Sequence, residues 1–302
     1  MRHPKNASHS KHSYPPLPPA LDAPLAELHT EATGRVAYYA DEDGDGRPLL
    51  LVHSINAAPS SFELKPLFER FRFERPVYSI DLPGFGQSER GDRNYSPALY
   101  AEAIEAMLEQ VIGAPADVLA LSLGAEFAAR AALAAPEKVA SLVLVSPTGF
   151  GKRKPPGKGV GRVAHRVLST PLWAQGLFDL VTSRQSIRYY LNKSFTDTAP
   201  QELIDYAYAT SHQPGARFAP LLFLSGQLFT RDALTGLYAR LTDVPVLAIA
   251  DGDPYVRFER LPQFAASRPN WRHESLAPNM GLPHWEHPEA TCDLLEGFWQ
   301  GD

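Results

Sequence analysis

The chain has 302 residues, enough for one large α/β domain that carries an insertion. Its 29 Lys and Arg stand against 34 Asp and Glu, a formal net charge of -5, so no extended basic field favours nucleic acid as a partner. No apolar stretch approaches the ~20 residues needed to span a bilayer. The single cysteine, Cys292, cannot form an internal disulfide, which favours the cytoplasm.

Residues 1–25 mix His, Ser, Lys and Pro without apolar periodicity and without the hydrophobic run of a secretory signal, and we expect a flexible tail there. From Arg35 onward, short apolar runs alternate with helical patterns, which predicts an α/β fold with a mostly parallel sheet flanked by helices. The expected strands are 35–40, 49–52, 76–80, 116–121, 141–145, 244–250 and 271–276, and the expected core helices include 62–71, 97–111 and 288–299.

The alternation stops between residues 149 and 241, where Pro and Gly punctuate segments with helical spacing. Such a stretch is too long for a loop, so we expect a helical lid inserted into a core made of 26–148 and 242–302. Its basic run, Lys152-Arg153-Lys154 with Lys158 and Arg162, is interpreted as a solvated loop. The expected lid helices are 171–181, 186–191, 200–210 and 221–241.

A serine lies between a buried strand and a helix in the segment Ala120-Leu121-Ser122-Leu123-Gly124. A strained strand-to-helix turn projects a serine hydroxyl freely only if the residues two before and two after it are small. Ala120 and Gly124 meet that requirement, so Ser122 is a candidate nucleophile, although a buried turn serine is the alternative.

The octapeptide Asp81-Leu82-Pro83-Gly84-Phe85-Gly86-Gln87-Ser88 follows the expected strand 76–80. Together with the serine turn, the loop at His53 and the segment near Pro283, it makes the chain resemble the α/β-hydrolase fold, in particular its lipase- and esterase-like members. In those members the octapeptide is structural. The resemblance implies a Ser-His-acid hydrolase with a lid and with no metal or organic cofactor.

The resemblance assigns the oxyanion hole to two backbone amides, those of Leu123 and Ile55. The loop that carries Ile55 usually begins His-Gly, whereas here it begins His53-Ser54. A backbone donor does not depend on its side chain, so this change matters only if the backbone needs a positive φ there.

The acid and the base follow the last strands. In the family the acid follows the strand after the lid, commonly within an Asp-Pro dipeptide, so the resemblance implies Asp253 as the acid, with Asp251 as the alternative. The family places its catalytic histidine where this chain has Gly281. Either His284, three positions along, supplies the imidazole, or the protein has lost its general base; His273 and His287 are poorer candidates.

We therefore expect a serine hydrolase that cleaves a small ester, thioester or similarly activated carbonyl compound through an acyl-enzyme. The alternatives are a non-catalytic binding protein and a carbon-carbon bond hydrolase or lyase that uses the same serine. The aromatic residues of the expected lid suggest an apolar or aromatic substrate, although such residues often only dock a lid on a core. The sequence predicts no oligomeric state.

Overall fold

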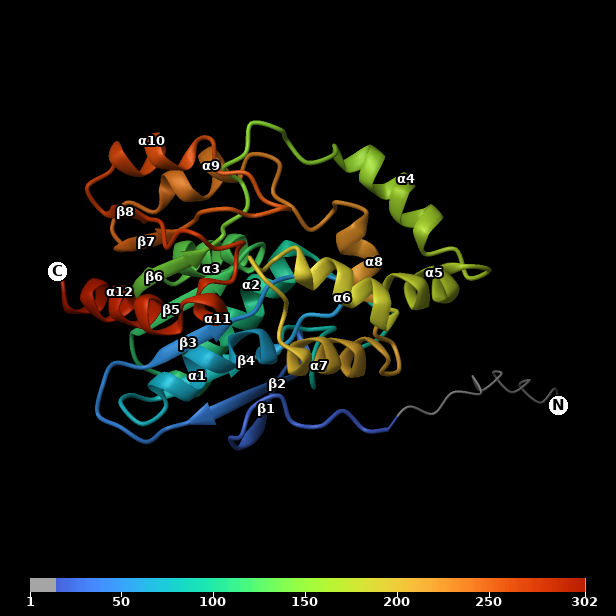
Figure 1. Cartoon of the computed structure of the whole chain (residues 1–302), viewed down its shortest axis with the longest axis horizontal. Coiled ribbons are helices and arrows are strands. Elements are labelled where there is room, and N and C mark those ends of the chain that lie inside the picture. Colours follow the sequence, from blue (N-terminus) through green and yellow to red (C-terminus); the bar gives the residue numbers. More distant parts are fainter. Residues whose placement is uncertain (1–14, 302) are drawn as a thin grey trace.

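The computed structural model describes residues 15–301, so the first fourteen residues of the expected tail lie outside the described part. An eight-stranded sheet in the order β1-β2-β4-β3-β5-β6-β7-β8 forms the centre of the molecule (Figure 1). β1 and β2 pair antiparallel, β2 pairs antiparallel with β4, and the other pairs are parallel. The strands are β1 (Leu25–Thr30), β2 (Gly34–Asp41), β3 (Leu49–Val52), β4 (Val77–Ile80), β5 (Ala116–Leu121), β6 (Val139–Val145), β7 (Val246–Ile249) and β8 (Trp271–Glu274).

The central strands are buried on both faces because their side chains alternate between two apolar clusters. In β3, Leu50 and Val52 join the cluster under α2 (Pro97–Ala106) and α3 (Gly124–Ala134), while Leu49 and Leu51 join the cluster under α1 (Lys65–Phe71) and α12 (Pro288–Gln300). These two pairs of helices therefore cover opposite faces of the sheet (Figure 1).

Several boundaries differ from the expected ones. The expected helix 62–71 is a 3-10 turn, η1 (Ser61–Leu64), followed by α1, and the expected helix 97–111 changes after α2 into a π-helical segment, η2 (Met107–Ile112). Three short helical elements also complete the core: η3 (Pro136–Lys138), α10 (Leu261–Ala266) and α11 (Pro283–Glu286).

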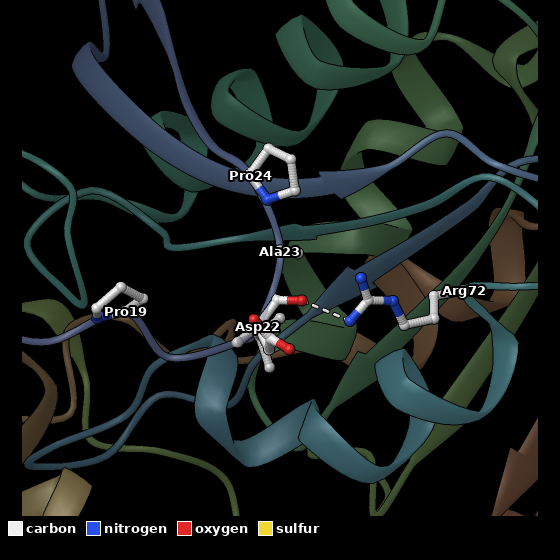
Figure 2. Close-up of a pocket in the computed structure, with 6 residues that line it drawn as sticks. Pro19, Asp22, Ala23, Pro24 and Arg72 are labelled. Carbon is white, nitrogen blue, oxygen red and sulfur yellow. Dashed lines mark hydrogen bonds between the residues drawn. The ribbon is translucent and has the colours of Figure 1, made fainter.

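Residues 15–24 do not form a free tail. The Ala20 amide donates to the Tyr39 hydroxyl at 2.8 Å, and both Ala20 and Leu21 are buried. Figure 2 shows the Arg72 guanidinium donating to the Asp22 carbonyl oxygen in a shallow pocket beside Pro19 and Pro24. This segment leads into the edge strand β1, which the sequence patterns did not reveal.

The segment between β6 and β7 is helical, and we call its residues 149–241 the helical insertion. Two expectations are wrong here. The basic run is a loop only as far as Gly157, since a helix begins at Lys158, and the expected helix 221–241 is interrupted at Gly226, whose φ is +78°. The elements are α4 (Lys158–Leu168), α5 (Ala174–Val181), α6 (Arg184–Asn192), α7 (Gln201–Ser211), α8 (Phe218–Leu224), α9 (Ala233–Gly236) and η4 (Tyr238–Arg240).

The insertion rests on the loops that follow β3 and β4. Tyr206 of α7 stacks on Phe62 with ring centroids 4.6 Å apart, and a Cβ on Gly84 would lie 2.7 Å from the Ala219 Cβ of α8. It thus contacts the carboxyl edge of the parallel strands, where α/β folds place their sites. Within residues 15–301, no helix has both the length and the apolar character to cross a bilayer.

Candidate active site

Ser122 occupies a strained turn between β5 and α3. Its φ is +50°, a left-handed conformation that non-glycine residues adopt at a cost of roughly 1–2 kcal/mol. The Ser122 amide donates to the Val145 carbonyl at 2.8 Å, and a Cβ on Gly124 would lie 2.5 Å from the His53 carbonyl oxygen. Gly124 therefore lets the loop after β3 approach the start of α3, as the sequence pattern predicts.

Two backbone amides near this turn are free. In the part of the chain that the structure describes, neither the Leu123 amide nor the Ile55 amide donates a hydrogen bond to the protein. Leu123 is the residue before the first turn of α3, where the helix leaves N–H groups unpaired and favours negative charge. Free donors of this kind suit an oxyanion, and the assignment of these two amides to the oxyanion hole stays a prediction.

Glu63, which the sequence patterns did not single out, holds the loop that carries Ile55. Its buried carboxylate accepts from the Ser54 amide at 3.0 Å, the Ser54 hydroxyl at 3.1 Å and the Asn56 side-chain amide at 2.7 Å. Burial raises the pKa of Glu63, and the His53 ring and these donors oppose that rise. A charged residue between Phe62 and Leu64, in an otherwise apolar segment, is the signal that could have found it.

Asp253 lies beyond the end of β7. One of its carboxylate oxygens accepts from the amides of Tyr255 and Val256, at 2.7 and 2.8 Å. Burial raises the pKa of Asp253, while these two amides and the Ser146 hydroxyl lower it. The alternative acid, Asp251, accepts from the Asn279 amide at 3.0 Å and so anchors the loop that precedes α11.

Gly281 lies directly against the second oxygen of that carboxylate. A Cβ on Gly281 would be 2.7 Å from Asp253 Oδ2 and 3.4 Å from the Ser146 hydroxyl oxygen, and its φ of +111° strains any L residue. Ser146 itself has a φ of +47°, follows β6 and donates to the Gly281 carbonyl at 3.3 Å. Position 281, beside the Asp253 carboxylate, therefore favours a glycine both by its backbone conformation and by the space available.

His284, the histidine nearest in sequence, is fully buried in α11. Its Nε2 lies 2.8 Å from the Glu63 carbonyl oxygen, which also accepts from the Trp285 indole at 2.7 Å. Burial lowers the pKa of His284 to about 4. Within residues 15–301, no hydrogen bond joins this ring to Asp253 or to Ser122, so the structure does not bring the three proposed triad residues together.

The other histidines near the strand ends have different partners. His53 Nε2 accepts from the Leu82 amide at 2.9 Å, so its Nδ1 carries the proton and donates to the Ser54 carbonyl at 2.6 Å. His287 Nε2 lies 2.6 Å from the Pro278 carbonyl oxygen, and His273 lies in β8. Within residues 15–301, neither His287 nor His273 forms a hydrogen bond with Ser122.

The octapeptide 81–88 is structural, as expected. Asp81 accepts from the Ser61 and Gln87 amides, each at 2.8 Å, and a Cβ on Gly86 would lie 2.0 Å from Asp81 Cγ. Only a glycine allows the turn to close on this carboxylate, which connects the loop after β4 to η1.

The aromatic side chains of the helical insertion mainly pack against the core. Tyr238 packs edge-to-face on Trp271 of β8 with ring centroids 5.9 Å apart, and Phe178 is buried like Tyr206, whereas Tyr189 and Tyr190 are half exposed. Buried Glu126 of α3 also fastens the insertion, because its carboxylate accepts from the Thr230 amide at 2.7 Å. These rings therefore carry little information about a substrate.

Comparisons with known proteins agree with this architecture. The model of the alpha/beta hydrolase family matches residues 49–294. A pimeloyl-[acyl-carrier protein] methyl ester esterase of Aeromonas hydrophila is 27% identical over 268 residues, which cover 84% of this chain and 96% of the esterase.

A second relative is the dihydrolipoyllysine-residue acetyltransferase component of the acetoin cleaving system of Cupriavidus necator. It is 31% identical over 132 residues, 43% of this chain, so the match spans only 34% of that protein. Among solved structures, a thermophilic esterase of Thermogutta terrifontis superposes with a TM-score of 0.69 at 19% identity, covering 92% of this chain and 98% of the esterase. Because the family model matches most of the chain and the fold agrees with it, this chain belongs to the alpha/beta hydrolase family.

Proposed function

We propose that the protein is a serine hydrolase that cleaves a small ester, thioester or similarly activated carbonyl compound. The observation that carries the proposal is the strained backbone of Ser122, since strain of this kind persists where the surrounding structure imposes it and is common at active sites. The free amides of Leu123 and Ile55 support the same chemistry. A cytoplasmic location belongs to this proposal, because Cys292 is buried and unpaired.

In the proposed reaction, the Ser122 hydroxyl attacks the carbonyl carbon while His284 takes up its proton. The tetrahedral oxyanion accepts hydrogen bonds from the Leu123 and Ile55 amides. The intermediate expels the alcohol or thiol, which receives the proton, and water then hydrolyses the acyl-enzyme by the same route. Asp253 would orient the imidazole, and the His284 ring would first have to leave the Glu63 carbonyl oxygen.

Labelling with a fluorophosphonate probe tests the nucleophile. We expect the wild type to be labelled and Ser122→Ala not to be. Ser267→Ala, on the surface after α10, is the matched serine control and should label like the wild type. Equal labelling of wild type and Ser122→Ala would end the proposal.

A p-nitrophenyl butyrate assay tests the base. If His284 accepts the proton, His284→Ala should lower turnover by at least about 100-fold, since general-base assistance is typically worth 10²–10⁴. His29→Ala, in the exposed edge strand β1, should leave turnover unchanged. Equal turnover by His284→Ala and wild type would remove His284 from the mechanism without removing Ser122.

The second candidate function is that of a binding protein with no general base. The packing of Gly281 on Asp253, with His284 bonded elsewhere, favours it. Its signature is a wild type that neither reacts with fluorophosphonate nor hydrolyses short esters. Ester turnover that is lost in Ser122→Ala would exclude it.

A further inference from the structure

α4 is an amphipathic helix that exposes its apolar side. Val160, Val163 and Val167 follow one another at the spacing of a single helix face, and they are 66%, 66% and 53% exposed. Such a stripe normally faces a core, yet here it faces solvent. Figure 1 shows α4 at the outer edge of the molecule, away from the sheet.

The helix touches the rest of the protein through its opposite side. Gly161 is its one buried residue, and a Cβ there would lie 2.8 Å from Gln227 Cγ and 3.3 Å from the Ser225 carbonyl oxygen. Close approach through a glycine fixes the helix against the turn after α8. This contact leaves the valine stripe uncovered.

The apolar surface continues beyond the end of α4. The Trp173 indole donates to the Val167 carbonyl at 2.9 Å, which holds this half-exposed ring beside the last turn of the helix. Next to it, Leu172 is 87% exposed, and Leu180 of α5 is exposed as well. We call this surface, made of Val160, Val163, Val167, Leu172 and Trp173, the α4 patch.

The segment that carries the valines of the α4 patch is basic. Residues 152–168 contain six Lys and Arg and no Asp or Glu, in a chain whose net charge is -5. Only Lys154 in this segment forms an ion pair, with Asp232, whereas Lys158, Arg162 and Arg166 form none within residues 15–301. Unpaired cations beside an apolar stripe are the combination by which a helix lies in the interface of an anionic membrane.

We propose that the α4 patch docks the protein on the surface of a membrane containing anionic lipids. The valines and Leu172 enter the boundary between headgroups and acyl chains, Trp173 lies at headgroup level, and Arg162 and Arg166 contact lipid phosphates. Charge complementarity selects this occupant, because a second copy of the chain would place two clusters of cations against each other. The docking is peripheral and does not depend on the chemistry at Ser122.

Co-sedimentation with vesicles tests the proposal on the full-length protein. We expect binding to vesicles of equal parts phosphatidylserine and phosphatidylcholine, little binding to pure phosphatidylcholine, and release as salt is raised toward 1 M, where the Debye length falls to about 3 Å. Arg162→Ser/Arg166→Ser should weaken binding by about 30-fold, as expected from about 1 kcal/mol for each cation near an anionic surface. Val163→Ser/Val167→Ser should also weaken it at least tenfold.

Matched controls separate the α4 patch from apolar and basic surface in general. Phe73→Ser removes an exposed aromatic ring after α1, and Lys138→Ser removes a cation of η3, so both should bind like the wild type. Brominated acyl chains should quench Trp173 fluorescence in the wild type and lose that effect in Trp173→Phe.

Three results would overturn the proposal. One is the absence of vesicle binding at low salt, and another is equal binding to neutral and anionic vesicles. The third is concentration-dependent self-association that Val163→Ser/Val167→Ser abolishes while vesicles bind nothing, which would assign the patch to a second copy of the chain. Circular dichroism of each variant should match that of the wild type, because the substituted side chains are exposed or partly exposed.

Discussion

The two halves of the candidate site differ in how they are built. On the nucleophile side, Ser122 is strained, the amides of Leu123 and Ile55 are free, and Glu63 holds the loop in place. On the acid-base side, the Asp253 carboxylate meets Gly281, and His284 bonds to the Glu63 carbonyl oxygen. The backbone on the nucleophile side is therefore arranged as a serine nucleophile would need, whereas on the acid-base side no imidazole is hydrogen-bonded to Asp253 within residues 15–301.

The largest effect should come from filling the close approach on the nucleophile side. In Gly124→Ala, the new Cβ would lie 2.5 Å from the His53 carbonyl oxygen, a backbone atom that cannot swing away. We expect the free energy of unfolding to fall by about 3 kcal/mol, the upper range for overpacking. Urea denaturation measures it, and fluorophosphonate labelling should fall in the same variant.

Gly297→Ala is its control. Apart from its chain neighbours and the backbone of α12 itself, nothing lies within 4 Å of the Cβ position of this glycine, so alanine should stabilise the protein by about 0.5–1 kcal/mol through helix propensity. If Gly124→Ala and Gly297→Ala change the free energy of unfolding by the same amount, the contact with the His53 carbonyl oxygen does not destabilise Gly124→Ala.

The next prediction concerns His284 and pH. Its pKa is about 4 in the folded protein against 6.5 when exposed, so the unfolded chain takes up a proton first as the pH falls. The stability contribution of the neutral ring is present above about pH 6.5 and is lost as the pH falls to 4, a loss of about 3 kcal/mol. Measured against His284→Gln, which can still donate to the Glu63 carbonyl oxygen, the wild type should show this extra loss.

Burial raises the pKa of three carboxyls, those of Glu63, Glu126 and Asp253, and their effect on the pH dependence of stability is opposite to that of His284. Wild type and His284→Gln are therefore compared at each pH. These carboxyls stabilise the folded state more as the pH falls. Identical pH profiles for wild type and His284→Gln would show that the ring is not buried in solution, and would favour its movement toward Ser122.

The fold could be predicted from the sequence where local pattern decides structure. β3 and β5 match the expected ranges, because unbroken apolar runs bounded by turn residues leave few alternatives. β1 was missed, since its alternation is weak and one face of an edge strand is exposed. The helix expected at 221–241 breaks at Gly226, whose left-handed φ of +78° follows the end of α8; a glycine at this place is a helix stop signal that hydrophobic periodicity alone does not record.

The candidate site likewise has a part that local sequence patterns predict and a part that they do not. The strained serine and its small neighbours follow from steric rules that act within five residues, so the sequence locates them. Where His284 points depends on Glu63, which lies 221 positions earlier in the chain, and no local rule contains that contact. The Glu63 carboxylate differs, because its contact with Ser54 spans only nine positions and a charged residue in an apolar segment is a local signal for it.

A smaller effect is expected for alanine at position 281. The φ of +111° strains an L residue by about 1–3 kcal/mol, but the nearest neighbour is the end of the Asp253 side chain, which can rotate. Gly281→Ala should therefore cost about 1–2 kcal/mol in urea denaturation, less than Gly124→Ala. Gly281→His should not raise ester turnover, because its Cβ would displace the carboxylate that ought to orient the ring. A gain in turnover would show that the acid-base side still accepts an imidazole.

The smallest effect isolates the strain at the nucleophile. At a φ of +50° glycine is unstrained whereas alanine is not, so Ser122→Gly should be more stable than Ser122→Ala by about 1 kcal/mol. At Ser267, whose φ is -88°, the order should reverse, because glycine there only adds freedom to the unfolded chain. Thermal or urea unfolding of the four variants measures both differences. The same order at both positions would mean that Ser122 bears no backbone strain, and the nucleophile side would then be no better prepared for catalysis than the acid-base side.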